Sequence, residues 1–221
     1  MTIKAITFDL DNTLIDFLRM KRRASNAAAR AMVKNGLGMS IRKAENELFS
    51  IYLKNIEGRT AFEEFLKKNN AYTERRMAAA INAYNNTKLK YMKPYPGVKR
   101  TLVFLKKKGL KLAIISDAPK IKAYQRLDAL GIADYFDVVV GLEDTHRKKP
   151  SKMPFKKALE LLELQAAEVL HVGDWPERDI KGAKKLGMKT CLARYGGVTG
   201  RSIQADYEIT KIEELIRIIG A

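Results

Sequence analysis

The sequence predicts an α/β fold, with a Rossmann-like parallel sheet that has helices on both faces and a small α-helical second domain. From residue 94 onward, short β-branched runs alternate with helical patterns, which is typical of a parallel sheet. Before residue 94, a long stretch rich in Ala, Lys, Arg and Glu contains no proline. We therefore expect one domain from residues 1–15 and 94–221, and a helical domain from residues 16–93.

The first strand is expected at residues 3–8, because IKAITF is a short run of β-branched and aromatic residues. The stretch that follows predicts about four helices. They begin near residue 17, after Ser40, after Thr60 and after Thr73. Thr60 and Glu63 have the spacing of a capping box, in which each side chain accepts a hydrogen bond from the other residue's backbone.

The remaining elements alternate in type along the chain. Strands are expected at residues 111–116, 137–141, 169–173, 189–193 and near 206–209. Helices are expected between them at residues 97–108, 119–130, 154–164 and 177–186. The carboxyl ends of parallel strands lie along one edge of the sheet, and ligands bind there. Side chains that follow a strand directly are therefore candidate functional residues.

Two aspartates, Asp9 and Asp11, follow the first strand at once. Residues two apart at a strand end can point into the same crevice, and two carboxylates there suit a hard cation such as Mg²⁺. Such a pair is costly to bury without a cation or ligand. The alternative is an ordinary Asx turn, with Asn12 and Thr13 as turn or cap residues.

A second pair of aspartates lies near the end of a later strand. Asp174 follows the apolar run at 169–173, and Asp179 lies where the next helix is expected to begin. Carboxylates from this strand would complete the cation site. Helix capping would also explain Asp179, but it would not explain Asp174 at the strand end.

Three further polar residues suit a phosphate group. Ser116 and Asp117 follow the run LAII, where a hydroxyl and free backbone amides can bind phosphate oxygens. Lys149 precedes a predicted helix, and its charge could neutralise phosphate and hold a carboxylate. Each signal alone is weak, because serine is common in loops and Lys149 lies in a basic run that solvent would accommodate.

In their order and spacing, these signals resemble the four motifs of the haloacid dehalogenase-like hydrolase superfamily. The matching segments are DLDNT at residues 9–13, Ser116, Lys149-Pro150, and GDWPERD at residues 173–179. The likeness spans nearly the whole chain. The helical stretch at residues 16–93 resembles the type-1 cap domain of that family, and the rest resembles its catalytic core.

The resemblance implies catalytic roles for several residues. Asp9 would attack phosphorus and form an aspartyl-phosphate. Asp11 would protonate the leaving oxygen and would then deprotonate the hydrolytic water. Ser116 and Lys149 would hold the phosphoryl group, together with Asp117.

The implied cofactor is Mg²⁺. Its implied ligands are Asp9, the backbone carbonyl of Asp11, and Asp174, while Asp179 would support the water shell of the metal or Lys149. Phosphoryl transfer depends mainly on positioning and on charge neutralisation, which this set of residues would supply.

The function predicted in this way is Mg²⁺-dependent hydrolysis of a small phosphomonoester. Asp11 favours a phosphatase over a 2-haloacid dehalogenase, since a departing alkoxide needs a proton and a departing halide does not. Dehalogenase-like and phosphomutase activities remain alternatives, because a phosphomutase would use the same residues.

The net charge of +17 suggests anionic partners. Residues 16–93 carry 17 Lys and Arg against 7 Asp and Glu, so the cap would favour a small anionic phosphorylated substrate. A dispersed, solvated surface explains the charge equally well. A basic nucleic-acid-binding protein or a polynucleotide-end phosphatase are further alternatives. We do not expect nucleic acid as a partner, because clustered aromatic residues for base stacking are absent.

The sequence indicates a cytoplasmic protein without a membrane partner, because no apolar run reaches membrane-spanning length. It leaves a monomer and a homodimer equally open. Cys191 is the only cysteine and is expected to be a buried small hydrophobe. His171 is expected in the core rather than as a ligand. Trp175 could line the entrance of the site or pack in the core.

Overall fold

The computed structural model describes residues 2–54, 60–197 and 203–220. Its contacts divide the chain into two compact units. Residues 1–16 and 93–221 form one, called here the core unit, and residues 17–92 form the other, called here the helical unit.

The core unit is built on a six-stranded sheet, in which every pairing is parallel. The order of its strands is β3-β2-β1-β4-β5-β6. Their bounds are Ala5–Phe8 (β1), Lys111–Ile115 (β2), Val138–Val140 (β3), Val169–Gly173 (β4), Lys189–Ala193 (β5) and Tyr207–Ile209 (β6). All four residues of β1 are buried, as a central strand with helices on both faces requires.

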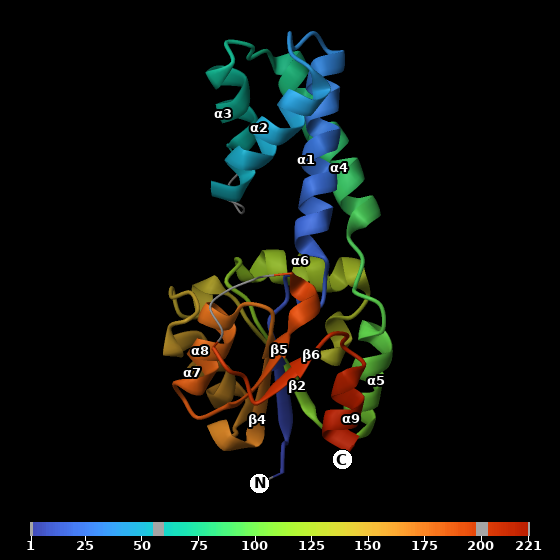
Figure 1. The fold of residues 1–221 in the computed structure, drawn as a ribbon. Helices are drawn as coiled ribbons and strands as arrows, with labels where there is room; N and C mark the ends of the chain where they lie inside the picture. The colour runs from blue at the N-terminus through green and yellow to red at the C-terminus, as the bar shows by residue number, and fades with distance from the viewer. Residues whose placement is uncertain (1, 55–59, 198–202, 221) are drawn as a thin grey trace. The chain divides into compact units, whose positions relative to one another are not determined.

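Helices cover both faces of this sheet, which confirms the predicted fold class (Figure 1). Figure 1 shows α7 and α8 on one face and α5 and α9 on the other. The bounds are Val98–Lys107 (α5), Lys120–Leu130 (α6), Lys152–Leu162 (α7), Lys181–Lys184 (α8) and Glu214–Gly220 (α9). Short 3-10 segments cover Ala133–Tyr135, Leu142–Asp144, Ala166–Glu168 and Arg194–Gly196, and a π-helical turn covers Pro176–Ile180. The terminal α9 is not among the predicted helices.

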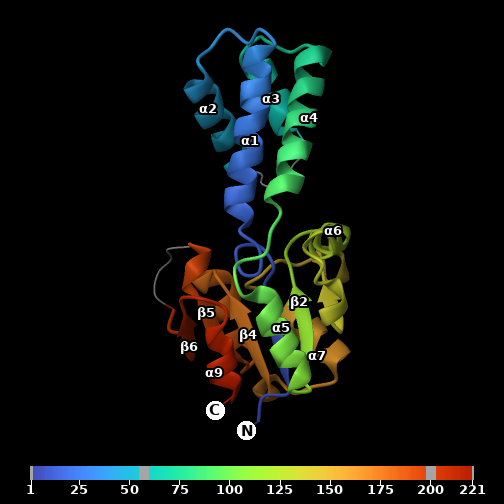
Figure 2. The ribbon, with the colours of Figure 1, turned by 90° about the vertical axis from the view of Figure 1, so that its right-hand side faces the viewer.

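The helical unit has a hydrophobic core of its own. Its helices are α1 (Phe17–Lys34), α2 (Ile41–Lys54), α3 (Ala61–Lys68) and α4 (Glu74–Tyr91), and α1 runs alongside α4 (Figure 2). Alanines on α1 and large apolar side chains on α3 belong to one buried cluster. Three rings, those of Tyr52, Phe62 and Tyr84, stack or meet edge to face with centroids 5.5–5.8 Å apart.

One predicted helix cap and one predicted helix start differ from the structure. The capping box at Thr60 and Glu63 is wrong: Thr60 has helical backbone angles and its side chain makes no capping hydrogen bond. A capping hydroxyl needs an extended backbone, as at Thr73, whose side chain accepts a hydrogen bond from Arg76 N at 3.2 Å. Helix α7 begins two residues before the predicted position, because Ser151 caps it by accepting a hydrogen bond from Met153 N.

The predicted helix at 177–186 is also divided. Its first part is the π-helical turn Pro176–Ile180, and only Lys181–Lys184 is α-helical. Wide turns of this kind are uncommon and often occur at functional sites. Within the described residues, no helix is both long and apolar enough to cross a membrane.

We predict that Asp206→Ala lowers the free energy of unfolding by about 1–2 kcal/mol at neutral pH. The carboxylate accepts hydrogen bonds from Thr190 N (2.9 Å) and Thr190 Oγ1 (2.7 Å), which ties β5 to the segment before β6. Burial would raise the pKa of Asp206, but these hydrogen bonds lower it. A lowered pKa means that the contribution is present above the ordinary carboxyl range and is lost as the pH falls through the folded pKa.

Urea unfolding of the wild type and the variant at pH 7 and pH 3 would measure this difference. The exposed Asp134→Ala is a matched control, with an expected change below about 0.5 kcal/mol. If the free energies of unfolding of wild type and Asp206→Ala differ as much at pH 3 as at pH 7, the carboxylate is not the stabilising group.

Candidate active site

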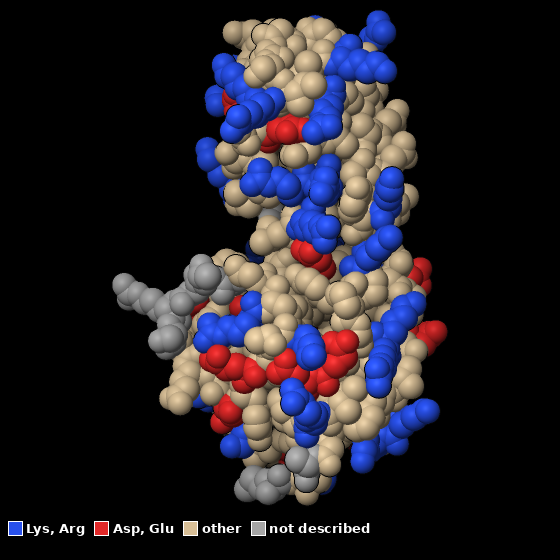
Figure 3. Space-filling view, turned by 45° about the vertical axis from the view of Figure 1, so that its right-hand side comes forward, with Lys and Arg blue, Asp and Glu red and all other residues tan. Residues whose placement is uncertain are grey.

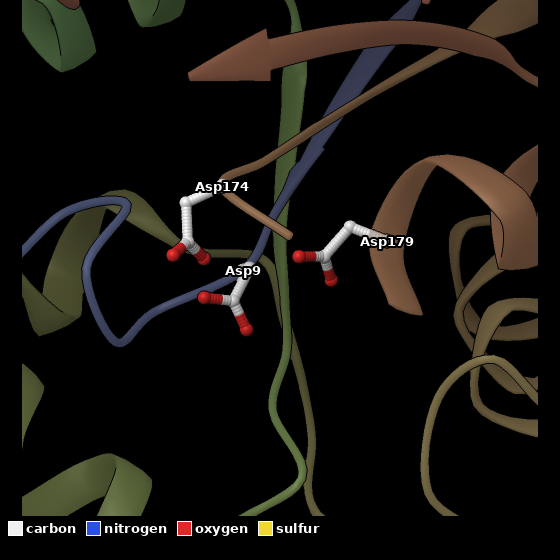
Figure 4. A group of neighbouring side chains, drawn as sticks. All are labelled: Asp9, Asp174 and Asp179. Atoms are coloured by element: carbon white, nitrogen blue, oxygen red, sulfur yellow. The ribbon is translucent and has the colours of Figure 1, made fainter. Parts of the chain in front are cut away.

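Three aspartates meet at the carboxyl edge of the sheet. Asp9 follows β1 and Asp174 follows β4, and these strands are neighbours in the sheet. Asp179, from the π-helical turn, joins them, so that one carboxylate oxygen from each residue lies within 4.8 Å of the others. Figure 4 shows the three side chains converging from their separate segments. The structure thus brings together three of the four aspartates that the sequence singled out for a metal site.

Close packing of the backbone holds this group in place. A Cβ atom at Gly173 would lie 2.5 Å from Cβ of Asp179, so a larger residue would displace that aspartate. A Cβ at Gly196 would lie 2.3 Å from Cβ of Asp174. The amide of Trp175 donates a hydrogen bond to Asp179 Oδ2 at 3.0 Å. Asp179 therefore lies within the turn rather than at its N-cap, and capping alone does not explain it.

The ammonium group of Lys149 lies between two of these carboxylates. Its Nζ is 2.5 Å from Asp9 Oδ1 and 2.6 Å from Asp179 Oδ1, and the side chain is 2% exposed. Burial would lower the pKa of Lys149, but the charges of Asp179 and Asp9 outweigh it and raise the pKa. Lys149 is therefore a fixed positive charge that holds Asp9 in place.

One ammonium group does not balance three carboxylates. Burial raises the pKa of Asp9, and Lys149 opposes this rise. Burial, with the charges of Asp9 and Asp179, raises the pKa of Asp174 to about 9. Thr13 Oγ1 donates to Asp174 Oδ1 at 3.5 Å, while Oδ2 is buried and has no hydrogen-bond partner in the part of the chain that the structure describes. Oxygen donors, excess negative charge and an unsatisfied buried oxygen together fit a hard divalent cation.

The carboxylate of Asp11 lies outside this group. Its Oδ2 is 2.6 Å from Nη1 of Arg126, on α6. The metal role predicted for Asp11 involved its backbone carbonyl, and that role stays a prediction. Arg126 was not predicted as a site residue. Its signal in the sequence is a charged residue on the same helix face as the apolar Ala123, Leu127 and Leu130.

The predicted phosphate-binding residues lie at the ends of neighbouring segments. Ser116 follows β2 directly, and its hydroxyl accepts a hydrogen bond from Ala118 N at 3.2 Å. The carboxylate of Asp117 is engaged elsewhere: it accepts a hydrogen bond from Lys149 N at 2.8 Å and pairs with Arg178. Asp117 thereby positions the backbone of Lys149. Because the carboxylate of Asp117 is engaged in this way, any contact of Asp117 with phosphate would come from its backbone.

Two residues outside the motifs support the site or border it. His171 is fully buried, as predicted, with Nδ1 2.9 Å from Thr7 Oγ1 and Nε2 3.6 Å from Asp179 Oδ1. Burial lowers its pKa, although Asp179 opposes this effect. Trp175 is 40% exposed, and the Arg178 guanidinium lies over its ring at 4.7 Å. The core position considered for Trp175 is therefore wrong.

Comparison with known proteins agrees with this geometry. A sequence profile of the haloacid dehalogenase-like hydrolases matches residues 6–193. The chain is 34% identical to a glyceraldehyde 3-phosphate phosphatase of Pyrococcus furiosus, over 98% of this chain and 93% of that protein. It is 33% identical to a phosphoglycolate phosphatase of Aquifex aeolicus, over 98% and 97%. A solved HAD phosphatase from Thermococcus onnurineus superposes with a TM-score of 0.68 at 28% identity, over 99% and 98% of the two chains.

We predict that Asp174→Asn stabilises the metal-free protein. The substitution removes a group whose ionisation is opposed by burial and by the charges of Asp9 and Asp179. With a folded pKa of about 9, Asp174 keeps its proton at neutral pH while the unfolded chain loses it, so its cost to stability grows as the pH rises. In EDTA at pH 8, we expect the midpoint of thermal unfolding to rise by roughly 2–4 °C, which corresponds to about 1 kcal/mol, and by less at pH 5.

The same variant should lose the stabilisation that added Mg²⁺ gives the wild type, because it lacks one cation-binding carboxylate. Thermal melts with EDTA and with Mg²⁺ measure both effects, and Asp134→Asn is the exposed control. A midpoint that falls at both pH values, together with an intact Mg²⁺ response, would contradict the assignment of this group.

Proposed function

This chain belongs to the haloacid dehalogenase-like hydrolase family, as a phosphoric monoester hydrolase of small molecules, and we propose that it uses Asp9 as the nucleophile of a Mg²⁺-dependent reaction. The observation that carries the proposal is the buried contact of 2.5 Å between Lys149 Nζ and Asp9 Oδ1, beside the carboxylates of Asp174 and Asp179. Lys149 holds one oxygen of Asp9, which leaves the other to attack phosphorus.

The reaction proposed has two steps. Asp9 attacks phosphorus, the bond from phosphorus to the ester oxygen breaks, and Asp11 gives its proton to the departing oxygen. Asp11 then takes a proton from water, which attacks the aspartyl-phosphate and releases inorganic phosphate and the free carboxylate of Asp9. Ser116 and Lys149 bind the phosphoryl oxygens in both steps.

The residues present would hold Mg²⁺ through the carboxylates of Asp9 and Asp174 and the backbone carbonyl of Asp11, with Asp179 in support. When bound, the cation would supply the positive charge that allows an anionic carboxylate and an anionic phosphate to meet. Lys149 contributes the same kind of neutralisation from the protein itself.

We propose that the helical unit acts as the cap that selects the substrate. In the basic run at its start, Lys21 is buried, with Nζ 5.2–5.6 Å from the ring centroids of Phe17, Tyr52 and Tyr84. Arg22 lies over the ring of Phe49 at 4.0 Å. Aromatic contacts thus orient the charges of Lys21 and Arg22. Charges that served only to solvate the surface would not need such contacts. Elsewhere the charges are dispersed: Figure 3 shows Lys and Arg at separate places on the visible face.

The substrate class proposed is a phosphorylated compound of two or three carbons with an aldehyde or a carboxylate. Two findings support it: the names of the relatives, glyceraldehyde 3-phosphate phosphatase and phosphoglycolate phosphatase, and the excess of positive charge in the helical unit. A phosphomutase would retain the phosphoryl group, so stoichiometric release of inorganic phosphate distinguishes the two activities.

We predict that Asp9→Asn lowers kcat by at least about 10³-fold, because the amide cannot act as the nucleophile. Circular dichroism should show an unchanged fold, since the side chain keeps its shape. Acid-quenched wild type mixed with substrate should gain the mass of one phosphoryl group, and the variant should not. Undiminished turnover by Asp9→Asn would instead assign the attack to a metal-activated water.

We also predict a salt dependence that differs between substrates. Phosphoglycolate carries a carboxylate as well as its phosphate, so screening of the basic cap should raise its KM more than the KM of an ester with an uncharged alcohol. Steady-state assays with Mg²⁺ at low and high ionic strength would measure the ratio, which we expect to change by about 3- to 10-fold. If the ratio of the two KM values stays the same at every salt concentration, the cap charges do not have the proposed role.

A further inference from the structure

Arg126 is a buried charge on a helix that otherwise presents apolar residues to the core. Its side chain is 6% exposed, and it shares the buried stripe of α6 with Ala123, Leu127 and Leu130. An apolar residue at this position would continue the stripe. Because a buried ion pair adds little net stability over well-packed apolar groups, stability alone does not account for an arginine there.

One ion-pair partner of Arg126 is Asp11, the aspartate to which the proposed function assigns proton transfer. Nη1 of Arg126 lies 2.6 Å from Oδ2 of Asp11, whose side chain is 23% exposed. Arg126 and Asp11 are 115 residues apart in the sequence, and both belong to the core unit. The contact therefore joins α6 to the loop that follows β1.

The backbone of that loop is held independently of the ion pair. Asn12 N donates to Ile15 O at 2.7 Å, and Leu14 N donates to Leu10 O at 3.0 Å. Asn12 has a φ of 62°, in the left-handed region. A Cβ at Gly196 would lie 2.5 Å from Asn12 O, so the backbones are closely packed. With the main chain held in this way, rotation of its own side chain decides where the carboxylate of Asp11 lies.

We propose that Arg126 is a positioning residue, which keeps the carboxylate of Asp11 apart from the metal-binding carboxylates and so reserves it for proton exchange with the leaving oxygen. The inference rests on the proposed function. Asp9, Asp174 and Asp179 already form a group whose carboxylate oxygens lie within 4.8 Å of one another, and a fourth carboxylate would be drawn to any cation bound there. The guanidinium offers Asp11 a competing positive partner outside that group.

The test compares two esters on Arg126→Met, Arg126→Lys and the wild type. p-Nitrophenyl phosphate has a good leaving group that needs little protonation, whereas an alkyl phosphate that the wild type hydrolyses needs a proton on its departing oxygen. We expect Arg126→Met to lower kcat for the alkyl ester by about 10- to 100-fold and kcat for the aryl ester by less than about 3-fold. Arg126→Lys should recover part of the loss.

The ratio of the two kcat values separates positioning from folding. Both esters are assayed on one preparation, so the ratio does not depend on the folded fraction. Arg100→Met, at an exposed position on α5, is the matched control and should leave the ratio unchanged. Equal losses for both esters in Arg126→Met would overturn the proposal and would leave Arg126 with a structural role.

A double-mutant cycle with Asp11→Asn completes the experiment. If Arg126 acts through Asp11, adding Arg126→Met to Asp11→Asn should cause no further loss with the alkyl ester. Additive losses would show that Arg126 acts by another route. Failure of the proposed function itself would be distinct, since the wild type would then be inactive on both esters or Asp9→Asn would remain active.

Discussion

The site depends on the electrostatic interaction between three closely spaced buried aspartates and the ammonium group of Lys149. Asp9, Asp174 and Asp179 are brought within 4.8 Å by a sheet edge and a turn that cannot easily relax, and Lys149 offsets only part of their charge. Burial and this imbalance of charge together raise the pKa of Asp174. A rigid scaffold that holds acidic groups this close together suits a hard cation.

Residues packed around the three aspartates and Lys149 maintain this arrangement. The absence of a side chain at Gly173 and at Gly196 allows Asp179 and Asp174 to approach the backbone closely. The carboxylate of Asp117 accepts a hydrogen bond from the amide of Lys149, which places the ammonium group between its partners. Together they show that the precision of the site comes from packing around the charges as well as from the charges themselves.

The helical unit holds its buried positive charge in a different environment. It has its own buried cluster, and its buried Lys21 lies among aromatic rings. A cation over aromatic faces keeps its charge while its stem is removed from water, so the unit can present positive charge in a defined place. In the proposed function, the core unit provides the nucleophile and the helical unit selects the substrate, so chemistry and selection could change independently.

Local pattern determined the strands, most of the helices, and the places of Asp9, Ser116 and Asp174 directly after strands, because strand ends and helix periods depend on a few neighbouring residues. The same local reasoning failed at Thr60, where the backbone had already become helical, and it missed α9. Only the tertiary structure decided that Asp11 pairs with Arg126 and that the carboxylate of Asp117 supports Lys149. Ion pairs and hydrogen bonds of this kind depend on distances between segments far apart in the chain, and no short-range periodicity encodes those distances.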